Sequence, residues 1–66
     1  MKVRINGEDI LLHRQVSIAA VITTRKINPE AVMVEYNGAI LPKENWDRVF
    51  LKEADILEIV SFVGGG

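Results

Sequence analysis

The sequence predicts an α+β domain in which one helix packs across a mixed sheet of four to five strands. Two observations lead to this prediction. Alternating polar and apolar residues indicate half-buried strands, and one stretch with apolar residues three and four apart indicates a helix. The strand stretches before and after the helical stretch each contain an Asn-Gly pair. The chain has 66 residues, a length that allows a single domain with a small core.

The first two strands form a predicted hairpin. Val3 and Ile5 share one face of the first strand, and Ile10 and Leu12 resume a similar pattern after Asn6-Gly7. A type I′ turn needs positive φ at both central residues, which asparagine tolerates and glycine adopts freely. Asn-Gly therefore predicts a tight turn between these strands.

A helix is predicted from about Ser17 to Lys26. Ser17 is suited to be its N-cap, because a serine hydroxyl can accept a backbone N–H from the first turn. Ile18, Val21 and Ile22 follow at offsets of three and four, which places them on one face of the helix. We expect Asn28-Pro29 to end it.

A second hairpin is predicted in VMVEYNGAIL, residues 32–41. Its alternation places Val32, Val34 and Tyr36 on one face of the strand and Met33 and Glu35 on the other. Beyond this hairpin, an irregular turn is expected around Trp46, which we interpret as a packing anchor, and Leu51 is expected to return to the core.

The last strand is predicted over residues 55–63. If Leu57 and Ile59 face the helix, then Glu58, Val60 and Phe62 face solvent. We expect this strand to lie beside the first, so that the chain leaves from the middle of the sheet. This order of elements is the β-grasp arrangement.

The composition argues against several classes of function. The net charge of −1 gives no electrostatic footprint for nucleic acid. The chain has no cysteine, which excludes thiolate zinc sites and cysteine nucleophiles, and no metal site is predicted. No apolar run approaches a membrane span. A composition without cysteine suits the cytoplasm, where we expect the protein, and we expect it to be a monomer when free.

No catalytic group of residues is recognisable. His13 is the single candidate base, and we interpret it as a polar residue closing the second strand. Asp55 and Glu58 are three residues apart in a strand, so they lie on opposite faces and form no acid–base pair. The sequence thus predicts a protein that is not itself an enzyme.

The terminal glycines suggest a different chemistry. We predict a folded domain over residues 1–63 and a flexible tail of Gly64, Gly65 and Gly66, since glycine adds nothing to a core. The α-carboxyl of Gly66 would be the reactive group. A carboxylate is a poor electrophile, so it needs activation, for example adenylation by ATP. The expected docking surface for the activating partner comprises Met33, Glu35, Glu58, Val60, Phe62 and Val63.

The sequence resembles the ThiS family, the sulfur carriers of thiazole formation in thiamine biosynthesis, within the ubiquitin-like β-grasp group that also includes the MoaD carriers. The resemblance covers nearly the whole chain and rests on "MKVRINGE", "NPEAVMVEYNGAILPKENW" and "LKEADILEIVSFVGGG". The family often has glycine where this chain has Lys26 and Ala54. Both residues adopt positive φ less readily than glycine, so we expect altered local turns.

The resemblance implies a set of partners. Gly66 would be adenylated by an E1-like adenylyltransferase (ThiF-like) that uses ATP, and converted to a thiocarboxylate with sulfur from a cysteine desulfurase or another donor. A thiazole synthase (ThiG-like) would then take the sulfur. The chain would be a cosubstrate that binds no cofactor stably.

Three alternatives share parts of this reasoning. A MoaD-type carrier would deliver sulfur to a molybdopterin precursor by the same carboxyl chemistry. A protein modifier would join Gly66 to a lysine of its target. A non-covalent ubiquitin-like interaction domain would use Val60 and Phe62 without any chemistry at the tail.

Overall fold

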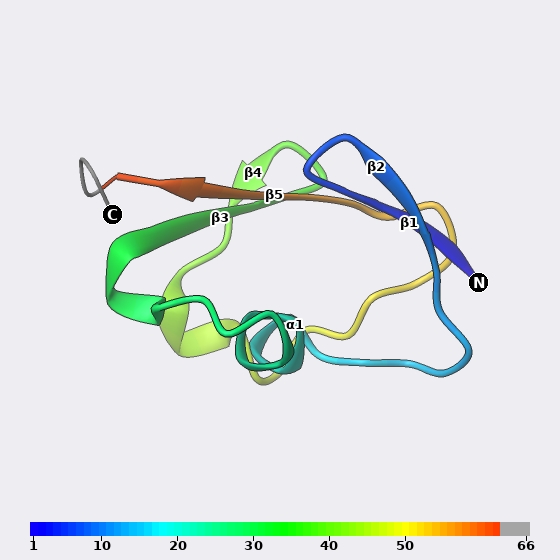
Figure 1. Ribbon diagram of the computed structural model, residues 1–66, viewed down its shortest axis with the longest axis horizontal. Helices are drawn as coiled ribbons and strands as arrows, with labels where there is room; N and C mark the ends of the chain where they lie inside the picture. Colours follow the sequence, from blue (N-terminus) through cyan, green and yellow to red (C-terminus); the bar gives the residue numbers. More distant parts are fainter. Residues whose placement is uncertain (63–66) are drawn as a thin grey trace.

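The computed structural model describes residues 1–62. These residues form a five-stranded sheet in the order β2-β1-β5-β3-β4, with helix α1 on one side of it (Figure 1). Val63 and the tail residues Gly64, Gly65 and Gly66 lie outside the described residues. The elements are β1 (Lys2–Ile5), β2 (Glu8–Leu11), α1 (Ile18–Thr24), β3 (Val32–Tyr36), β4 (Ala39–Ile40), β5 (Ile56–Ser61) and the 3₁₀ turns Pro29–Ala31 and Lys43–Asn45.

Both predicted hairpins are confirmed. β1 pairs antiparallel with β2, and β3 pairs antiparallel with β4. At each turn the asparagine and the glycine both have positive φ, 51° and 82° at Asn6-Gly7 and 52° and 89° at Asn37-Gly38. These values identify type I′ turns, which match the right-handed twist of the strands they join.

The helix begins as predicted and ends early. The Ser17 hydroxyl accepts the Ala20 N–H at 3.0 Å, which confirms the N-cap. The helix ends at Thr24 instead of Lys26, because the chain turns there in a Schellman motif. In that motif the N–H of Lys26 donates to the Thr23 carbonyl and the N–H of Ile27 to the Ile22 carbonyl. Asn28-Pro29 follows after the helix has already ended.

The left-handed residue of this motif is Lys26, at φ 59°, and Ala54 has φ 71° in the turn before β5. Both positions therefore keep positive φ although neither residue is glycine, so the turns that we expected to be altered retain the left-handed conformation. Alanine in this region costs about 1–2 kcal/mol because its Cβ crowds the following carbonyl. The surrounding contacts hold the chain in this conformation, since the Ala54 N–H donates to the Lys2 carbonyl at 2.8 Å.

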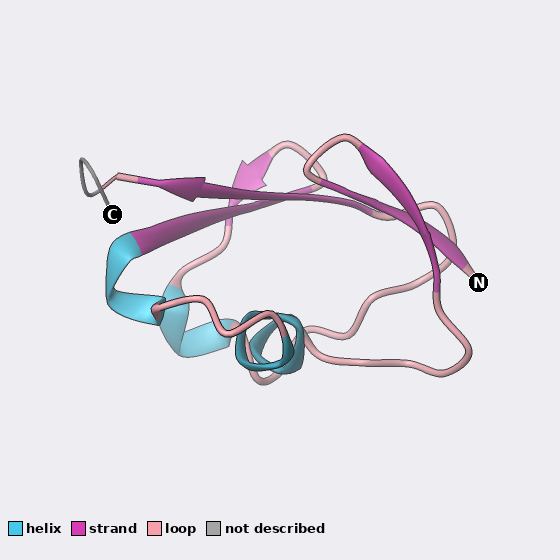
Figure 2. Ribbon diagram, viewed as in Figure 1, coloured by secondary structure: helices cyan, strands magenta, loops and turns pink. Residues whose placement is uncertain are grey.

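Strand β5 lies in the middle of the sheet, as predicted from the sequence (Figure 2). It runs parallel to β1 and antiparallel to β3. The predicted strand over residues 55–63 is observed as Ile56–Ser61 within the described residues. The mixed sheet with one α-helix across it confirms the predicted β-grasp fold for residues 1–62.

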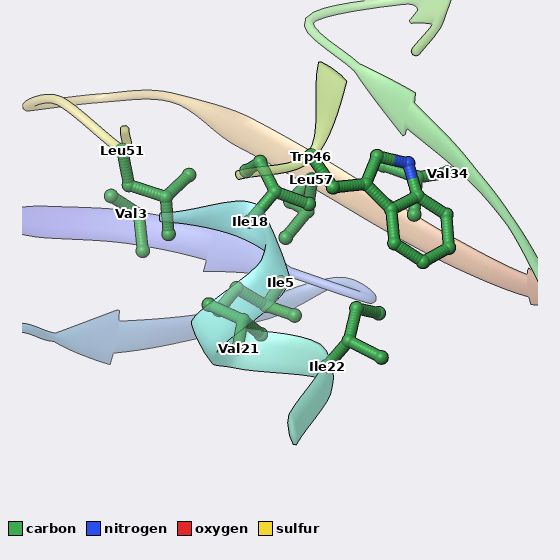
Figure 3. Packing of buried hydrophobic residues seen from close by; sticks show 9 residues of the cluster. All are labelled: Val3, Ile5, Ile18, Val21, Ile22, Val34, Trp46, Leu51 and Leu57. Atoms are coloured by element: carbon green, nitrogen blue, oxygen red, sulfur yellow. The ribbon is translucent and has the colours of Figure 1, made fainter. Parts of the chain in front are cut away.

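The core fills the space between the sheet and α1 (Figure 3). Trp46 is buried, and its indole N–H donates to the Leu41 carbonyl at 3.0 Å, which confirms its role as a packing anchor. Leu51 returns to the core as predicted. The buried cluster consists of Val3, Ile5, Ile18, Val21, Ile22, Val34, Trp46, Leu51 and Leu57.

Candidate functional site

The sheet has one face that no described element covers. Helix α1 and the 3₁₀ turns all lie on the other side of the sheet (Figure 1). The alternation of the strands places on this open face every docking residue predicted from the sequence, apart from Val63, which lies outside the described residues. These residues are Met33, Glu35, Glu58, Val60 and Phe62.

The register of β3 and β5 brings these residues together. Met33 lies opposite Val60, and Glu35 lies opposite Glu58. Val60 is 42% exposed and Phe62 is 62% exposed, whereas Leu57 on the inner face is fully buried. The structure thus forms a contiguous apolar and acidic patch at the end of β5 from which the tail continues. Its role in docking remains a prediction.

The open face also carries apolar residues that we did not single out from the sequence. Ile40 lies opposite Glu35 and is 64% exposed, and Ile56 is 45% exposed on β5. Leu11 is exposed on the edge strand β2, opposite Lys2. Cross-strand pairing between distant segments decides which of these residues meet, and one strand's alternation does not give that pairing.

Both neighbours of β5 help to hold it in place. The Asn6 side-chain oxygen accepts the Ile59 N–H at 2.7 Å, and the Asn37 side-chain oxygen accepts the Ile56 N–H at 2.8 Å. The Phe62 N–H donates to the Ala31 carbonyl at 3.1 Å. The last described residues of the chain are therefore anchored to the sheet up to Phe62.

Asp55 is the polar residue whose role sequence reasoning missed. It is only 5% exposed. One carboxylate oxygen accepts the Tyr36 hydroxyl at 2.6 Å and the Lys52 N–H at 2.8 Å, and the other accepts the Asn37 amide at 3.2 Å. The alternation that points Leu57 inward also points Asp55 inward, and this was the available signal. Glu58 lies on the open face, so the two carboxylates are on opposite faces, as predicted.

The environment of Asp55 keeps it charged. Burial raises the pKa of this carboxyl, but the hydrogen bonds from Tyr36, the Lys52 N–H and Asn37, together with the Lys52 charge, outweigh burial and hold the pKa below its usual value. The Lys52 ammonium donates to the Tyr36 oxygen at 2.9 Å and lies 3.7 Å from Asp55. The hydrogen bond with Tyr36 and the Asp55 carboxylate raise the pKa of Lys52.

The rest of the described chain offers little other chemistry. In residues 1–62 no group of three or more histidine, cysteine or acidic side chains is placed to hold a metal ion. His13 is exposed and lies two residues beyond the end of β2, so it does not close that strand. No helix among the described residues is both long and apolar enough to span a membrane.

The fold and the open face define a ubiquitin-like β-grasp protein whose central strand leads into the tail. Residues 3–66 match the ThiS family. The chain belongs to this family, as its resemblance in sequence implied.

Individual relatives agree with this assignment. The sulfur carrier protein ThiS of Bacillus subtilis is 34% identical over 64 residues, which cover 96% of this chain and 97% of that protein. A crystal structure of the thiamine biosynthesis protein ThiS from Geobacter metallireducens superposes with a TM-score of 0.84 at 29% identity, covering 100% of both chains. A thiazole synthase of Paramagnetospirillum magneticum is 36% identical over 66 residues, and the chain spans only 20% of its length.

Proposed function

We propose that this chain is the sulfur carrier for thiazole formation in thiamine biosynthesis, with the α-carboxyl of Gly66 as the carrier group. The observation that carries the proposal is the ThiS family match, which extends through residue 66 and includes the terminal glycines. The match to the Bacillus subtilis sulfur carrier over 97% of its length supports the same function. The carrier itself is a cosubstrate, and partner enzymes catalyse each step in the cytoplasm.

The proposed chemistry begins with activation. A carboxylate carries negative charge and lacks a good leaving group, so an adenylating partner joins Gly66 to the α-phosphate of ATP and releases pyrophosphate. A sulfur nucleophile then attacks the acyl carbon and displaces AMP. Sulfide gives the thiocarboxylate directly, whereas a persulfide, as from a cysteine desulfurase, gives an acyl disulfide that a thiol must then cleave.

The tail and the open face would have separate tasks. Ordering a glycine tail in a narrow channel costs about 1–2 kcal/mol per residue. Docking of the open face would supply the affinity that offsets this cost, through Met33, Val60, Phe62 and the neighbouring Val63. Glu35 and Glu58 would set the orientation of the partner on this face.

The proposal also includes delivery of the sulfur to a thiazole synthase. Thiazole synthases from Paramagnetospirillum magneticum and Magnetococcus marinus match the whole chain over 20% of their own length. Such proteins carry a region like this chain within a thiazole synthase, which supports a direct partnership. The same matches favour thiazole formation over a molybdopterin pathway.

The intact mass of the chain tests this proposal. The chain would be incubated with ATP, an E1-like adenylyltransferase and sulfide, beside a variant that lacks Gly66. We expect the mass gain of one oxygen replaced by sulfur, mapped to Gly66 and absent from the variant. An unchanged mass, with an adenylyltransferase shown to activate another carrier, would overturn the proposal and favour a non-covalent interaction domain.

A further inference from the structure

The open face has an uneven charge distribution along β5. Arg4 lies opposite Ile56, at the start of β5. Glu35 and Glu58, which we call the acidic pair, come next. Beyond them the face is apolar, and Phe62 lies close to where the tail continues. A protein docked beside the tail therefore meets both an apolar patch and the acidic pair.

The acidic pair is unfavourable in the free protein. Glu35 and Glu58 lie directly opposite each other, and like charges in this position destabilise a sheet. Both are half-buried among apolar residues, which weakens the screening by water. Neither carboxylate has a hydrogen bond or an ion pair with any residue from 1 to 62.

Arg4 and Lys52 are already paired with other residues of the chain. On the open face, the Arg4 guanidinium donates to Asp9 at 3.1 Å. Lys52 is bound to Tyr36 and lies beside Asp55 at the β3–β4 turn. The chain thus retains two adjacent carboxylates on an apolar face without supplying a cation to them.

We propose that the acidic pair receives a single arginine side chain from the protein that docks on the open face, with Met33, Val60 and Phe62 as the apolar surround. This inference rests on the proposed carrier function and specifies the chemistry of its activating partner. Residues opposite each other in an antiparallel pair have Cβ atoms about 4.5–5.5 Å apart. One planar guanidinium, with five donors, can therefore bond both carboxylates at once.

The position of the acidic pair also constrains the partner. Glu58 precedes Gly66 by eight residues. An extended chain spans at most about 3.3–3.6 Å per residue, so the backbone of Glu58 lies within roughly 29 Å of the Gly66 backbone, whose carboxyl meets the nucleotide on the partner. A partner of this kind presents a basic residue within an apolar surface, at one side of the channel that takes the tail.

A second copy of the chain fits this description less well. Its open face carries two basic residues, Lys2 and Arg4. The Arg4 guanidinium is already paired with Asp9, and the Lys2 ammonium lacks the planar fork that bonds two carboxylates at once. Bringing two open faces together would also set their acidic pairs near each other. Arg4 of one copy could neutralise the acidic pair of the other only if its own pair with Asp9 opened. We therefore assign the arginine to a different protein, and self-association is an outcome of the test.

The test measures ATP-dependent adenylation by the E1-like enzyme that activates the wild-type chain. The variants are Glu35→Gln, Glu58→Gln and the double substitution, with Glu44→Gln as a matched control. Glu44 is exposed in the 3₁₀ turn on the opposite side of the sheet. We expect the double variant to raise KM by about tenfold at low salt, with kcat unchanged, and to lose most of the salt dependence of KM.

Stability provides a second readout. Removing one or both charges of the acidic pair relieves repulsion, so the melting temperature should stay constant or rise while KM rises. A rise in KM that came only from damage to the fold would instead accompany a lower melting temperature, and this pattern would overturn the inference. The Glu44→Gln control should change neither KM nor its salt dependence.

The other outcomes separate this inference from the proposed function. If the wild type is not adenylated, the proposed function fails and this inference fails with it. If the wild type is adenylated but the double variant keeps KM within about twofold of wild type, the inference is wrong and the carrier function stands. A wild-type dimer that the double variant dissociates would assign the face to a second copy and also overturn the inference.

Discussion

Replacing Asp55 with asparagine should destabilise the fold severely. The substitution keeps the shape of the side chain and removes its charge, at a position that is 5% exposed. The two shorter hydrogen bonds, from Tyr36 and the Lys52 N–H, converge on one oxygen. If the new amide keeps an oxygen there, its NH₂ group faces the Asn37 amide, which is also a donor.

The magnitude follows from these contacts. A hydrogen bond to a charged group contributes about 1.5–3 kcal/mol and a neutral one about 0.5–1.5 kcal/mol. Asp55→Asn loses the bond to Asn37 and weakens the other two, while a neutral amide is less costly to bury. We expect a net loss of about 2–4 kcal/mol of unfolding free energy. A chain of this length has about 3–10 kcal/mol in total.

The dependence on pH has a definite sign. The folded-state pKa of Asp55 is lowered, so its charged form stabilises the fold fully above the unfolded pKa of about 3.9 and this contribution is lost as pH falls through the folded value. The difference in unfolding free energy between wild type and Asp55→Asn should therefore stay constant, at about 2–4 kcal/mol, between about pH 6 and 8. It should shrink in acid, where Asp55 becomes protonated.

Urea unfolding followed by tryptophan fluorescence measures this effect, since Trp46 is the single tryptophan and is buried. Tyr36→Phe is the matched comparison, because it removes one donor to the charged Asp55 and should cost about 1.5–3 kcal/mol. A difference in unfolding free energy between wild type and Asp55→Asn of less than about 1 kcal/mol at neutral pH would refute the reasoning. A difference that stays the same in acid would also refute it.

Three further predictions concern the backbone and the core. Ala54→Gly should raise the unfolding free energy by about 0.5–1 kcal/mol in urea titration, because removing the Cβ relieves its crowding at φ 71° by more than the added entropy of the unfolded chain costs. A lower unfolding free energy would contradict this. Asn6→Gly should lower the unfolding free energy by about 1 kcal/mol, because the Ile59 N–H loses its acceptor. Asn6→Asp keeps an acceptor and should lower it less, so equal losses in the two variants would contradict a stabilising role for this hydrogen bond. Trp46→Phe removes the donor to the Leu41 carbonyl and should lower the unfolding free energy by about 1–3 kcal/mol, measured by unfolding followed by circular dichroism. An unchanged unfolding midpoint would show that this hydrogen bond does not stabilise the fold.

Local signals predicted most of the fold. Each Asn-Gly pair specifies a turn through its own backbone preference, and Ser17 specifies the start of α1 through a hydroxyl that reaches only three residues ahead. The end of α1 was harder to predict from the sequence. Lys26 adopts left-handed backbone without a glycine, so no residue type marked the Schellman motif there.

Interactions between distant segments were harder to predict. The Asn6 side chain caps an N–H that is 53 residues away, and Asn37 does the same for one 19 residues away. The sequence explains both asparagines by their turns alone, so nothing pointed to this second role. The Asp55 network likewise depends on how the β3–β4 turn meets the start of β5.

The candidate site was also predictable only in part from the sequence. Alternation along each strand is enough to predict that Met33, Glu35, Glu58, Val60 and Phe62 share one face. It does not show that Glu35 lies opposite Glu58, since that depends on the antiparallel register of β3 and β5. The charge repulsion that underlies our further inference therefore becomes visible only in the folded chain.

Transfer of labelled sulfur tests the central claim most directly. The chain would be loaded with ³⁴S at Gly66, purified, and incubated with a thiazole synthase and its other substrates. We predict that ³⁴S appears in the thiazole product in proportion to the carrier consumed. A thiazole product without the label, or a carrier that keeps its ³⁴S while product forms, would contradict the sulfur-carrier account.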